Sequence, residues 1–300
     1  MFLGHQSELE NNQWKVLEQS GKTKTLVNDN GSYRLQNNIC LHQGSRLREG
    51  TGTGLSVVCP YHAWSWNKEG KPLGSGTVGH SRGSEKCTNS EPLPTKNVYS
   101  WSGFLFENPV PLDDVDISGN YRLVEYRQDR VKSSFAAIMD LFLDIDHIPV
   151  VHPELYTAID VPTAKEIEWK TWPGGSIQYV PTLAGSNPEW AELAAGKKNP
   201  YGALWLAQYP FTQFEWQPGA VFVQVNQPVS DAETISHIFK YKDIDFGEKN
   251  WSINERVWET AWEQDKRQAE LLEPGWRFRQ DKLEKEKIIF RKFLHEHELV

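Results

Sequence analysis

Short runs of alternating apolar and polar residues, separated by turn residues, fill the first hundred positions of the chain. Residues 22–40 read as two such runs around an Asp-Asn-Gly turn, which is typical of a β-hairpin. Residues 98–112 form a strongly strand-like run that stops at two prolines, and the acidic residues 113–120 follow as a linker. The pattern predicts an all-β domain over residues 1–112.

The pattern changes in the remaining residues, 113–300. Residues 131–148 place apolar side chains at helical spacing up to Pro149, because the residue before a proline is pushed out of the helical region. A second helix is predicted over 253–275 and an amphipathic helix over the charged tail, 277–300. Strand-like runs lie between the helices, at 175–183, 202–211, 213–229 and 233–243. We therefore expect an α+β second domain with helices at both ends.

Charge and composition exclude several classes of protein. The 300 residues carry a formal net charge of −8, so a protein that binds a phosphate backbone is a poor expectation. No run of 18 apolar residues suggests a membrane span. Three cysteines cannot form a disulfide framework, and the first residues lack the features of a secretory signal. These observations predict a cytoplasmic protein that binds neither nucleic acid nor membrane.

Two cysteines and two histidines form a paired motif in the first domain. Cys40 and His42 make C-x-H, and Cys59 and His62 make C-x-x-H sixteen residues later. Two thiolates and two imidazoles suit a [2Fe–2S] cluster of raised reduction potential. The same four side chains also suit tetrahedral zinc, and chance spacing is a third interpretation. The remaining cysteine, Cys87, is interpreted as a structural or incidental thiol.

The strings around these residues resemble a known family. CLH, CPYHAWSW and LPTKNVYSWSGFLFENP are similar to the Rieske domains of Rieske non-haem iron oxygenases. The resemblance implies that Cys40 and Cys59 bind one iron of a [2Fe–2S] cluster, while His42 and His62 bind the other. The chain departs from the family by carrying Gln43 where relatives commonly have arginine and Ala63 where they have glycine.

A second group of polar residues lies near the end of the helix predicted over 131–148. Asp140, Asp144 and His147 are spaced to share one helical face, and His152 follows beyond Pro149. Two histidines and one carboxylate are the ligands that non-haem iron(II) oxygenases use, with open positions left for dioxygen. His147 and His152 are the predicted nitrogen ligands. Their alternative role is to cap or pack the helix end.

The string D-x-x-H-x-x-x-x-H resembles the catalytic motif of the same oxygenases, so the resemblance covers both domains. It implies a third ligand from a late helix, for which Asp265 is chosen because Glu270 follows it at the family spacing and because it shares a face with two tryptophans. Glu259 and Glu263 are the fallback ligands.

Two aspartates near the predicted histidine ligands need separate interpretation. In related trimers an aspartate at the position of Asp144 bridges a cluster histidine of one subunit and an iron histidine of its neighbour, so a path through His62, Asp144 and His147 is implied. Asp146 is off that face, and Asp140 stands where many relatives have asparagine, which leaves its role open.

The resemblance implies an oxygenase component of the short homotrimeric type, with an antiparallel, helix-grip (START-like) catalytic sheet. It would use dioxygen and a mononuclear Fe(II), with electrons from NAD(P)H relayed through a ferredoxin and/or flavin reductase. No G-x-G-x-x-G motif lies between a predicted strand and helix, so NAD(P)H is expected to act only through that partner.

The substrate is expected to be a small organic molecule, with hydroxylation or oxidative demethylation of an aromatic compound favoured. A quaternary ammonium substrate, held by some of the 13 tryptophans, is an alternative. Two further hypotheses are an electron-transfer protein with a non-catalytic second domain and a zinc-stabilised structural protein. The loosely defined pocket candidates are Gln178, Leu183, Trp205, Gln208, Phe211, Phe222 and Gln224.

Overall fold

Two units make up the chain. The computed structural model describes residues 1–18, 23–75, 91–153, 167–180, 202–272 and 285–299. One unit is Leu3–Pro109, and the other joins Met1–Phe2 to Val110–Val300. The division lies close to the boundary expected after Leu112. Cys87 and Leu183 lie outside the described residues.

The first unit is built from short antiparallel strands. Its largest sheet has the order β5-β2-β3-β4-β9, and two three-stranded sheets have the orders β6-β7-β8 and β1-β11-β10. The strands are β1 (Phe2–His5), β2 (Gln13–Leu17), β3 (Lys24–Asp29), β4 (Ser32–Asn37), β5 (Thr51–Thr53), β6 (Val57–Val58), β7 (Trp64–Trp66), β8 (Pro72–Ser75), β9 (Thr95–Asn97), β10 (Tyr99–Trp101) and β11 (Phe104–Phe106), with one 3-10 turn, η1 (Gln6–Glu8).

The predicted Asp-Asn-Gly turn joins β3 to β4. Asn30 and Gly31 have φ angles of 50° and 85°, and Asp29 pairs with Ser32 on either side of them. Two consecutive residues with positive φ form the turn type that matches the twist of a hairpin, and asparagine and glycine adopt it at low cost. This local signal therefore sets the register of the central sheet.

The second unit contains one seven-stranded antiparallel sheet with the order β12-β18-β17-β16-β15-β14-β13. Its strands are β12 (Tyr121–Val131), β13 (Glu168–Trp172), β14 (Gly175–Val180), β15 (Ala203–Gln208), β16 (Thr212–Gln217), β17 (Ala220–Ser230) and β18 (Glu233–Asp243). The predicted run 213–229 is therefore a hairpin, with its turn between Gln217 and Ala220. Strands β12 and β13 were not predicted.

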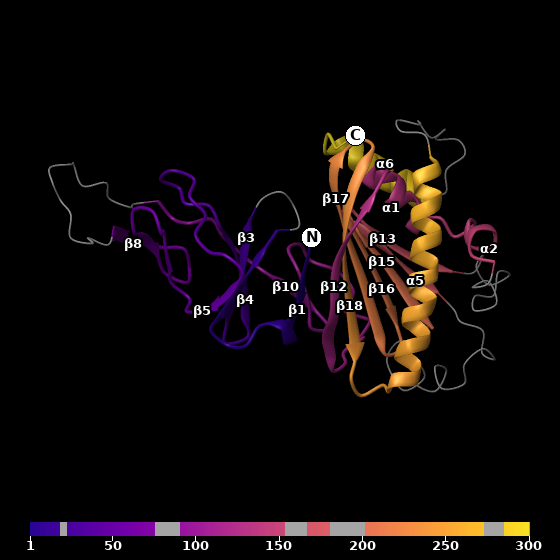
Figure 1. The fold of residues 1–300 in the computed structure, drawn as a ribbon, viewed down its shortest axis with the longest axis horizontal. Coiled ribbons are helices and arrows are strands. Elements are labelled where there is room, and N and C mark those ends of the chain that lie inside the picture. The colour runs from indigo at the N-terminus through magenta and orange to yellow at the C-terminus, as the bar shows by residue number, and fades with distance from the viewer. Residues whose placement is uncertain (19–22, 76–90, 154–166, 181–201, 273–284, 300) are drawn as a thin grey trace. The chain divides into compact units, whose positions relative to one another are not determined.

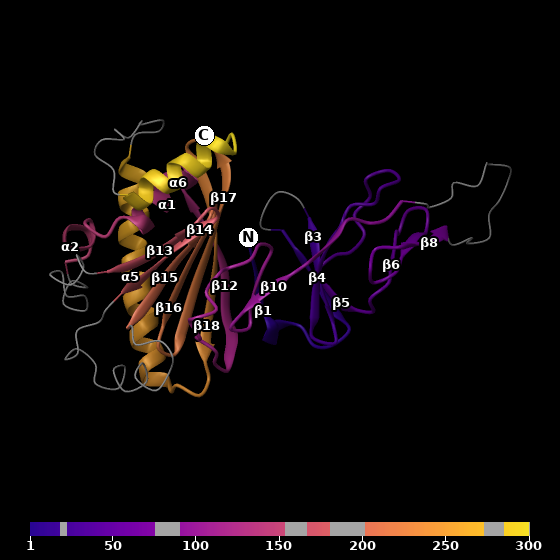
Figure 2. The same cartoon turned by 180° about the vertical axis from the view of Figure 1, so that it is seen from behind.

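Four described helices accompany this sheet: α1 (Phe135–Leu143), α2 (Ile148–Val151), α5 (Glu248–Leu271) and α6 (Lys285–Glu296). The long helix α5 lies along one face of the sheet (Figure 1). Seen from behind, α1 and α6 lie together at one end of it (Figure 2). The predicted α+β class, with an antiparallel sheet and flanking helices, is confirmed. The finer helix-grip designation stays a prediction.

The helix α5 is held by an aromatic core. Phe222 of β17 stacks on Trp258 with their ring centroids 5.0 Å apart and an interplanar angle of 11°. Trp251 and Trp262, on the same side of α5, are also buried. Aromatic side chains bury large apolar areas and contribute strongly to packing. The apolar stripe of α5 thus fixes the height and rotation of the helix over the sheet.

The prediction of one continuous helix over 131–148 was wrong. Helix α1 ends at Leu143, and Asp144 has extended backbone angles, with φ −96° and ψ 111°. A separate short helix, α2, begins after His147 and has a proline in its first turn. Proline is tolerated there because the first N–H groups of a helix have no intrahelical acceptor. Pro149 therefore starts a helix and does not terminate one.

In the part of the chain that the structure describes, no helix combines the length and apolar character needed to cross a membrane.

Candidate cluster and metal sites

The two cysteine–histidine loops of the first unit are built alike. In the first, the N–H of Cys40 donates to Ser45 O at 2.8 Å, and Gly44 N–H donates back to Cys40 O at 3.0 Å. In the second, Cys59 N–H donates to Trp64 O at 2.7 Å, and Ala63 N–H donates to Cys59 O at 3.0 Å. The hydrogen bonds close each loop so that its cysteine and histidine side chains project from one tight turn.

Ala63 occupies the place in the second loop that Gly44 occupies in the first. Both residues have positive φ, 57° for Ala63 and 71° for Gly44. Glycine adopts this conformation without steric cost, whereas a Cβ makes it unfavourable by about 1 kcal/mol. The departure from the family glycine therefore preserves the loop shape at a small cost in stability.

The four side chains of these loops converge. Cys40 and Cys59 are buried free thiols, and the His42 and His62 rings lie 4.6 Å apart between centroids. Trp64 stacks on His42 at 4.8 Å with an interplanar angle of 13°, which fixes the plane of that imidazole. The donor set of two sulfurs and two nitrogens fits a [2Fe–2S] cluster with mixed ligands.

The two thiols differ in how well their surroundings suit negative charge. Burial raises the pKa of Cys40. Burial also acts to raise the pKa of Cys59, but backbone N–H groups of His62 and Tyr61 point at its sulfur, and the net pKa is lowered. N–H donors directed at sulfur stabilise thiolate over thiol. The second loop is therefore prepared to hold a thiolate ligand.

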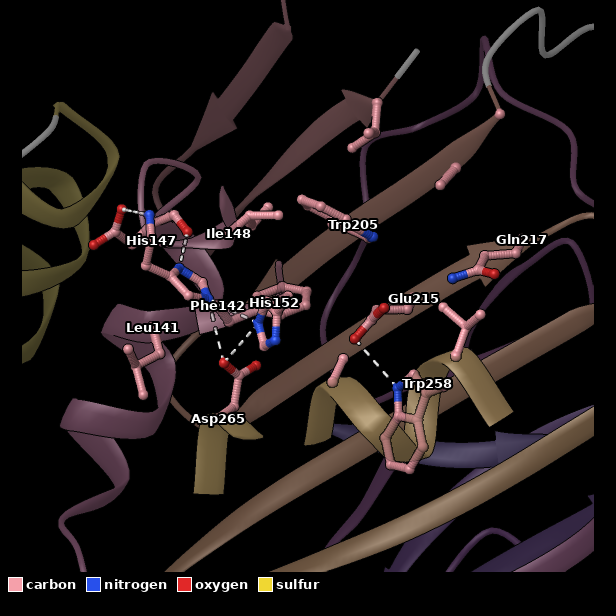
Figure 3. A pocket seen from close by; sticks show the side chains of 16 residues that line it. Leu141, Phe142, His147, Ile148, His152, Trp205, Glu215, Gln217, Trp258 and Asp265 are labelled. Carbon is pink, nitrogen blue, oxygen red and sulfur yellow. Dashed lines mark hydrogen bonds and ion pairs between the residues drawn. The ribbon is translucent and has the colours of Figure 1, made fainter. Parts of the chain in front are cut away.

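The second site joins the segment after α1 to helix α5. His147 precedes α2 and His152 follows it, so one turn of helix sets the two imidazoles face to edge. Asp265 comes from the middle of α5, and Figure 3 shows its carboxylate directed at both rings. The short helix α2 therefore brings the two imidazoles together.

Three ligand atoms meet at this point. Asp265 Oδ1 lies 3.2 Å from His147 Nε2 and 3.0 Å from His152 Nε2, and the two Nε2 atoms are 3.2 Å apart. The ligand atoms of these three side chains all lie within 4.8 Å of one another, close enough to hold a single metal ion. The structure thus brings together the three residues predicted as ligands of the mononuclear iron.

The second ring nitrogen of each histidine is engaged elsewhere. His147 Nδ1 donates to the backbone oxygen of Asp144, and His152 Nδ1 donates to Gln264 Oε1 at 2.7 Å. With a proton on each Nδ1, both Nε2 lone pairs face the Asp265 carboxylate. Three electron-pair donors on one side, with outer partners that fix the tautomers, are what a two-histidine, one-carboxylate iron(II) site requires.

The charges of the group support the same assignment. Burial acts to raise the pKa of Asp265, but His147 and His152 beside it hold that pKa below its ordinary value. Burial acts to lower the pKa of His152, and the neighbouring Asp265 more than reverses this. The carboxylate is therefore ionised at neutral pH, as a metal ligand must be.

The fallback ligands lie elsewhere. Glu259 accepts hydrogen bonds from Arg127 at 2.6 and 2.9 Å and forms an ion pair with Lys240 at 2.5 Å. Glu263 is exposed on the outer side of α5. Both side chains are thus turned away from the two histidines, because they lie on other faces of the helix.

Asp140 and Asp144 do not share a helical face with His147, contrary to the prediction, because α1 ends between them. Asp144 Oδ1 accepts from the N–H of His147 at 3.2 Å, and Asp144 Oδ2 pairs with Lys287 of α6 at 2.6 Å. Buried Asp140 pairs with Arg291 of α6, and burial raises its pKa to about 6. Asp146 is exposed. Helix α6 therefore neutralises buried Asp140 and partly buried Asp144.

A cavity of about 140 Å³ opens beside the three ligands. Leu141, Phe142, Ile148, Trp205, Glu215, Gln217, Val257, Trp258 and Ala261 are among the residues that line it. Trp205 was a predicted pocket residue, and Gln224 lines a smaller neighbouring cavity. The wall is mainly apolar and aromatic, which is typical of a site for a small organic ligand.

Two polar residues of the site, Gln264 and Glu215, were not predicted from the sequence. Gln264 directly precedes Asp265, and adjacency to a predicted ligand is a signal that could have identified it. Glu215 lies in an alternating strand, and nothing local distinguishes it from other polar residues of β16.

We expect Gln264→Leu to weaken iron binding by about 10- to 100-fold, the usual effect of removing an outer partner of a metal-ligating histidine. Leucine cannot accept the Nδ1 proton of His152, so the ring loses its fixed tautomer. Iron(II) titration of the apoprotein, with Gln264→Glu as the variant that restores the acceptor, measures the effect. Unchanged affinity in Gln264→Leu would contradict this role.

Parts of the chain are similar to known proteins. The model of the Rieske [2Fe-2S] domain matches residues 1–79. Putrescine 2-hydroxylase of Ralstonia nicotianae is 24% identical over 255 residues, which cover 78% of this chain and 67% of that one. The corresponding enzyme of Bordetella bronchiseptica is 24% identical over 278 residues, or 80% of this chain and 62% of that one. The chain thus spans about two thirds of the length of these relatives.

Solved structures agree in fold. A quaternary ammonium Rieske monooxygenase in complex with an inhibitor has a TM-score of 0.70 at 17% identity, covering 99% of this chain and 87% of that one. The naphthalene 1,2-dioxygenase of Rhodococcus, with indole bound, has a TM-score of 0.66 at 16% identity, covering 100% of this chain and 89% of that one.

A [2Fe–2S] domain joined to an α+β domain with two histidines and one carboxylate defines the class of iron-dependent oxygenases. Within that class, the chain contains a Rieske [2Fe-2S] domain and is similar over most of its length to oxygenase subunits of Rieske non-haem iron oxygenases. It is an oxidoreductase that uses molecular oxygen, with a Rieske cluster and mononuclear iron as cofactors. The predictions of family, enzyme class and cofactors are confirmed.

Proposed function

We propose that the chain is a terminal oxygenase component that hydroxylates or oxidatively demethylates a small organic substrate with dioxygen. The observation that carries the proposal is the meeting of His147 Nε2, His152 Nε2 and Asp265 Oδ1 at the wall of a mainly apolar cavity. A substrate in that cavity lies beside the three ligand atoms. Holding the reactants together in this way lowers the entropic part of the barrier.

Each set of residues has a defined task in this proposal. Cys40, Cys59, His42 and His62 hold the cluster, while His147, His152 and Asp265 hold the iron. When bound, the cluster supplies single electrons and the iron activates dioxygen. The backbone oxygen of Asp144 and the amide oxygen of Gln264 keep the Nδ1 protons in place, so that both imidazoles stay neutral ligands. The apolar cavity wall limits the access of water to the reacting atoms.

Electrons must come from outside the chain. We infer that a ferredoxin and/or flavin reductase relays them from NAD(P)H, since no nucleotide-binding motif lies between a strand and a helix. We also propose that the chain forms a homotrimer in the cytoplasm, by analogy with the short members of the family.

Asp144 is proposed to couple electron transfer between subunits, with its carboxylate between His62 of one subunit and His147 of the next. Two contacts support a well-positioned carboxylate: the N–H of His147 and the ammonium of Lys287. These contacts hold Asp144 beside the segment that carries the two histidine ligands. Asp144 can therefore affect the iron site without binding the iron.

Asp144→Asn is expected to retain both metals and to slow electron transfer to the iron in a single turnover by about 10-fold or more, as an outer partner of a ligand does. The amide still accepts from His147 N–H, but it loses the charge. Stopped-flow measurement of cluster oxidation tests this, with exposed Asp146→Asn as the matched control. A normal rate in Asp144→Asn would rule out the bridging role.

The oxygenase activity is tested by single turnover of the reduced holoenzyme under ¹⁸O₂. The substrates are compounds named for relatives and solved neighbours: putrescine, carnitine, glycine betaine, anthranilate and naphthalene. Mass spectrometry should detect one ¹⁸O atom in a hydroxylated product, or in the aldehyde released by demethylation. Oxidation of the cluster without labelled product from any of the five would favour an electron carrier instead.

A further inference from the structure

Glu215 is a carboxyl group in an aromatic part of the cavity. It lies on β16, and its side chain points into the cavity toward α5 (Figure 3). Asp144 and Asp265 also line the cavity, but the first pairs with Lys287 and the second with two histidines. No lysine or arginine of the described chain pairs with Glu215. Its charge, when present, is therefore available to a ligand.

Aromatic rings surround this carboxyl group. Strand pairing sets Trp205 of β15 on one side of Glu215 and Phe222 of β17 on the other. Trp258 of α5 stacks on Phe222 and donates its indole N–H to Glu215 Oε1 at 3.3 Å. One carboxylate among aromatic rings suits a cation, because the ring faces attract positive charge and the carboxylate neutralises it.

The surroundings of Glu215 disfavour its ionised form. Burial raises the pKa of Glu215 to about 8, and the nearby Asp265 adds to this, while Trp258 and His152 oppose it. A buried carboxyl without a cationic partner tends to stay protonated. A ligand that brings a positive charge would ionise it and gain a strong ion pair.

We propose that Glu215 is the counter-ion for an ammonium group of the substrate, so that the enzyme selects small aliphatic amine or quaternary ammonium cations over neutral aromatic compounds. The inference rests on the proposed oxygenase function and names its substrate class. Glu215 acts by charge, Trp258 holds the carboxyl group through its indole N–H, and Trp205 is the aromatic neighbour in the cavity wall. The carbon chain of the ligand then extends along the apolar wall toward the three metal ligands.

The test compares cations with neutral molecules of the same shape. Choline is paired with 3,3-dimethylbutan-1-ol, and 1,4-diaminobutane with 1,4-butanediol, in anaerobic calorimetric titration of the holoenzyme. At least one cation should bind at least about 30-fold more tightly than its neutral partner, since a desolvated charge pair is worth about 2 kcal/mol or more. Equal binding within both pairs, or no binding of either cation, would overturn the inference.

The same titration on Glu215→Gln should abolish the preference, with a loss of about 30-fold or more for the cation and little change for its neutral partner. Glutamine keeps the shape and can still accept from Trp258. Glu263→Gln is the matched control: it makes the same change at an exposed carboxylate outside the cavity, and should keep the preference. A Glu215→Gln enzyme that still prefers the cation would contradict the assignment.

A pH series separates charge recognition from a structural effect. Choline keeps its charge at all pH values, so its affinity for the wild type should rise from about pH 6 to about pH 8, as Glu215 ionises, and then level off. Asp265 and His152 are the other titratable groups that act on Glu215, and both remain in Glu215→Gln. The slope should therefore be lost in that variant, and its persistence would overturn the inference.

These titrations are independent of turnover. An enzyme that prefers cations but yields no labelled product would keep the assignment of Glu215 and refute the oxygenase proposal. An enzyme that oxygenates a neutral aromatic compound and binds no cation would refute the assignment of Glu215 and keep the oxygenase proposal.

Discussion

Asp265→Ala is expected to lose the mononuclear iron while it keeps the visible spectrum of the cluster. Removal of an outer partner already weakens a metal site by about 10- to 100-fold, so loss of the shared carboxylate ligand should cost more than about 100-fold in iron affinity. Turnover should fall to background with the iron. The two remaining ligands, His147 and His152, carry no negative charge to replace the one removed. Iron analysis after gel filtration, with the spectrum recorded on the same sample, measures both effects.

Two neighbours on α5 are the controls for this variant. Glu263→Ala changes an exposed carboxylate two residues away, and Glu259→Ala removes one that pairs with Arg127 and Lys240. Both variants should keep the iron, although Glu259→Ala leaves the buried Lys240 with fewer partners and should lower stability. If Asp265→Ala keeps its full iron content and either control loses iron, the third ligand is the glutamate replaced in that control.

Cys59→Ala is expected to abolish the cluster and, with it, all turnover driven by a reductase. Cys59 is buried, and N–H groups directed at its sulfur prepare it as a thiolate. The mononuclear iron should remain, because its ligands lie in the other unit. The expected sample therefore contains about one iron per chain, no acid-labile sulfide and no visible band. Iron and sulfide analysis, with the visible spectrum, measures these effects.

Tyr61→Phe is the matched control for Cys59→Ala, since it changes an exposed ring in the same loop. It should keep colour, sulfide and turnover. A coloured Cys59→Ala protein with normal sulfide would contradict the assignment of this cysteine. Loss of both metal centres in that variant would show that the two sites do not form independently.

The fold was most predictable where the signal is local. The Asp29-Asn30-Gly31 hairpin and the apolar stripe of α5 each follow from a few adjacent residues. Strand β12 was not predicted because many of its side chains are charged and find their partners on other elements. Arg127 donates a hydrogen bond to Glu259 of α5, and Glu125 forms an ion pair with Lys240 of β18. These partners lie more than a hundred residues away in the sequence. The local pattern of such a charged strand therefore looks like that of a solvent-exposed segment, although a helix covers it.

The candidate metal ligands could be named from spacing and resemblance, but the way they are held could not. Asp144 and His147 were predicted on one helix, whereas helix α1 ends at Leu143 and the short helix α2 sets His147 against His152. Glu215 reaches the cavity only through antiparallel pairing and the packing of α5 on Phe222. Such tertiary contacts have no counterpart in a local pattern.

One chain should carry both a Rieske cluster and a mononuclear iron. The most direct test is the content of iron, zinc and acid-labile sulfide in anaerobically purified protein, with a visible spectrum before and after dithionite. We expect about three irons and two sulfides per chain and a spectrum that bleaches on reduction. Zinc in place of iron, with no sulfide and no colour, would contradict it.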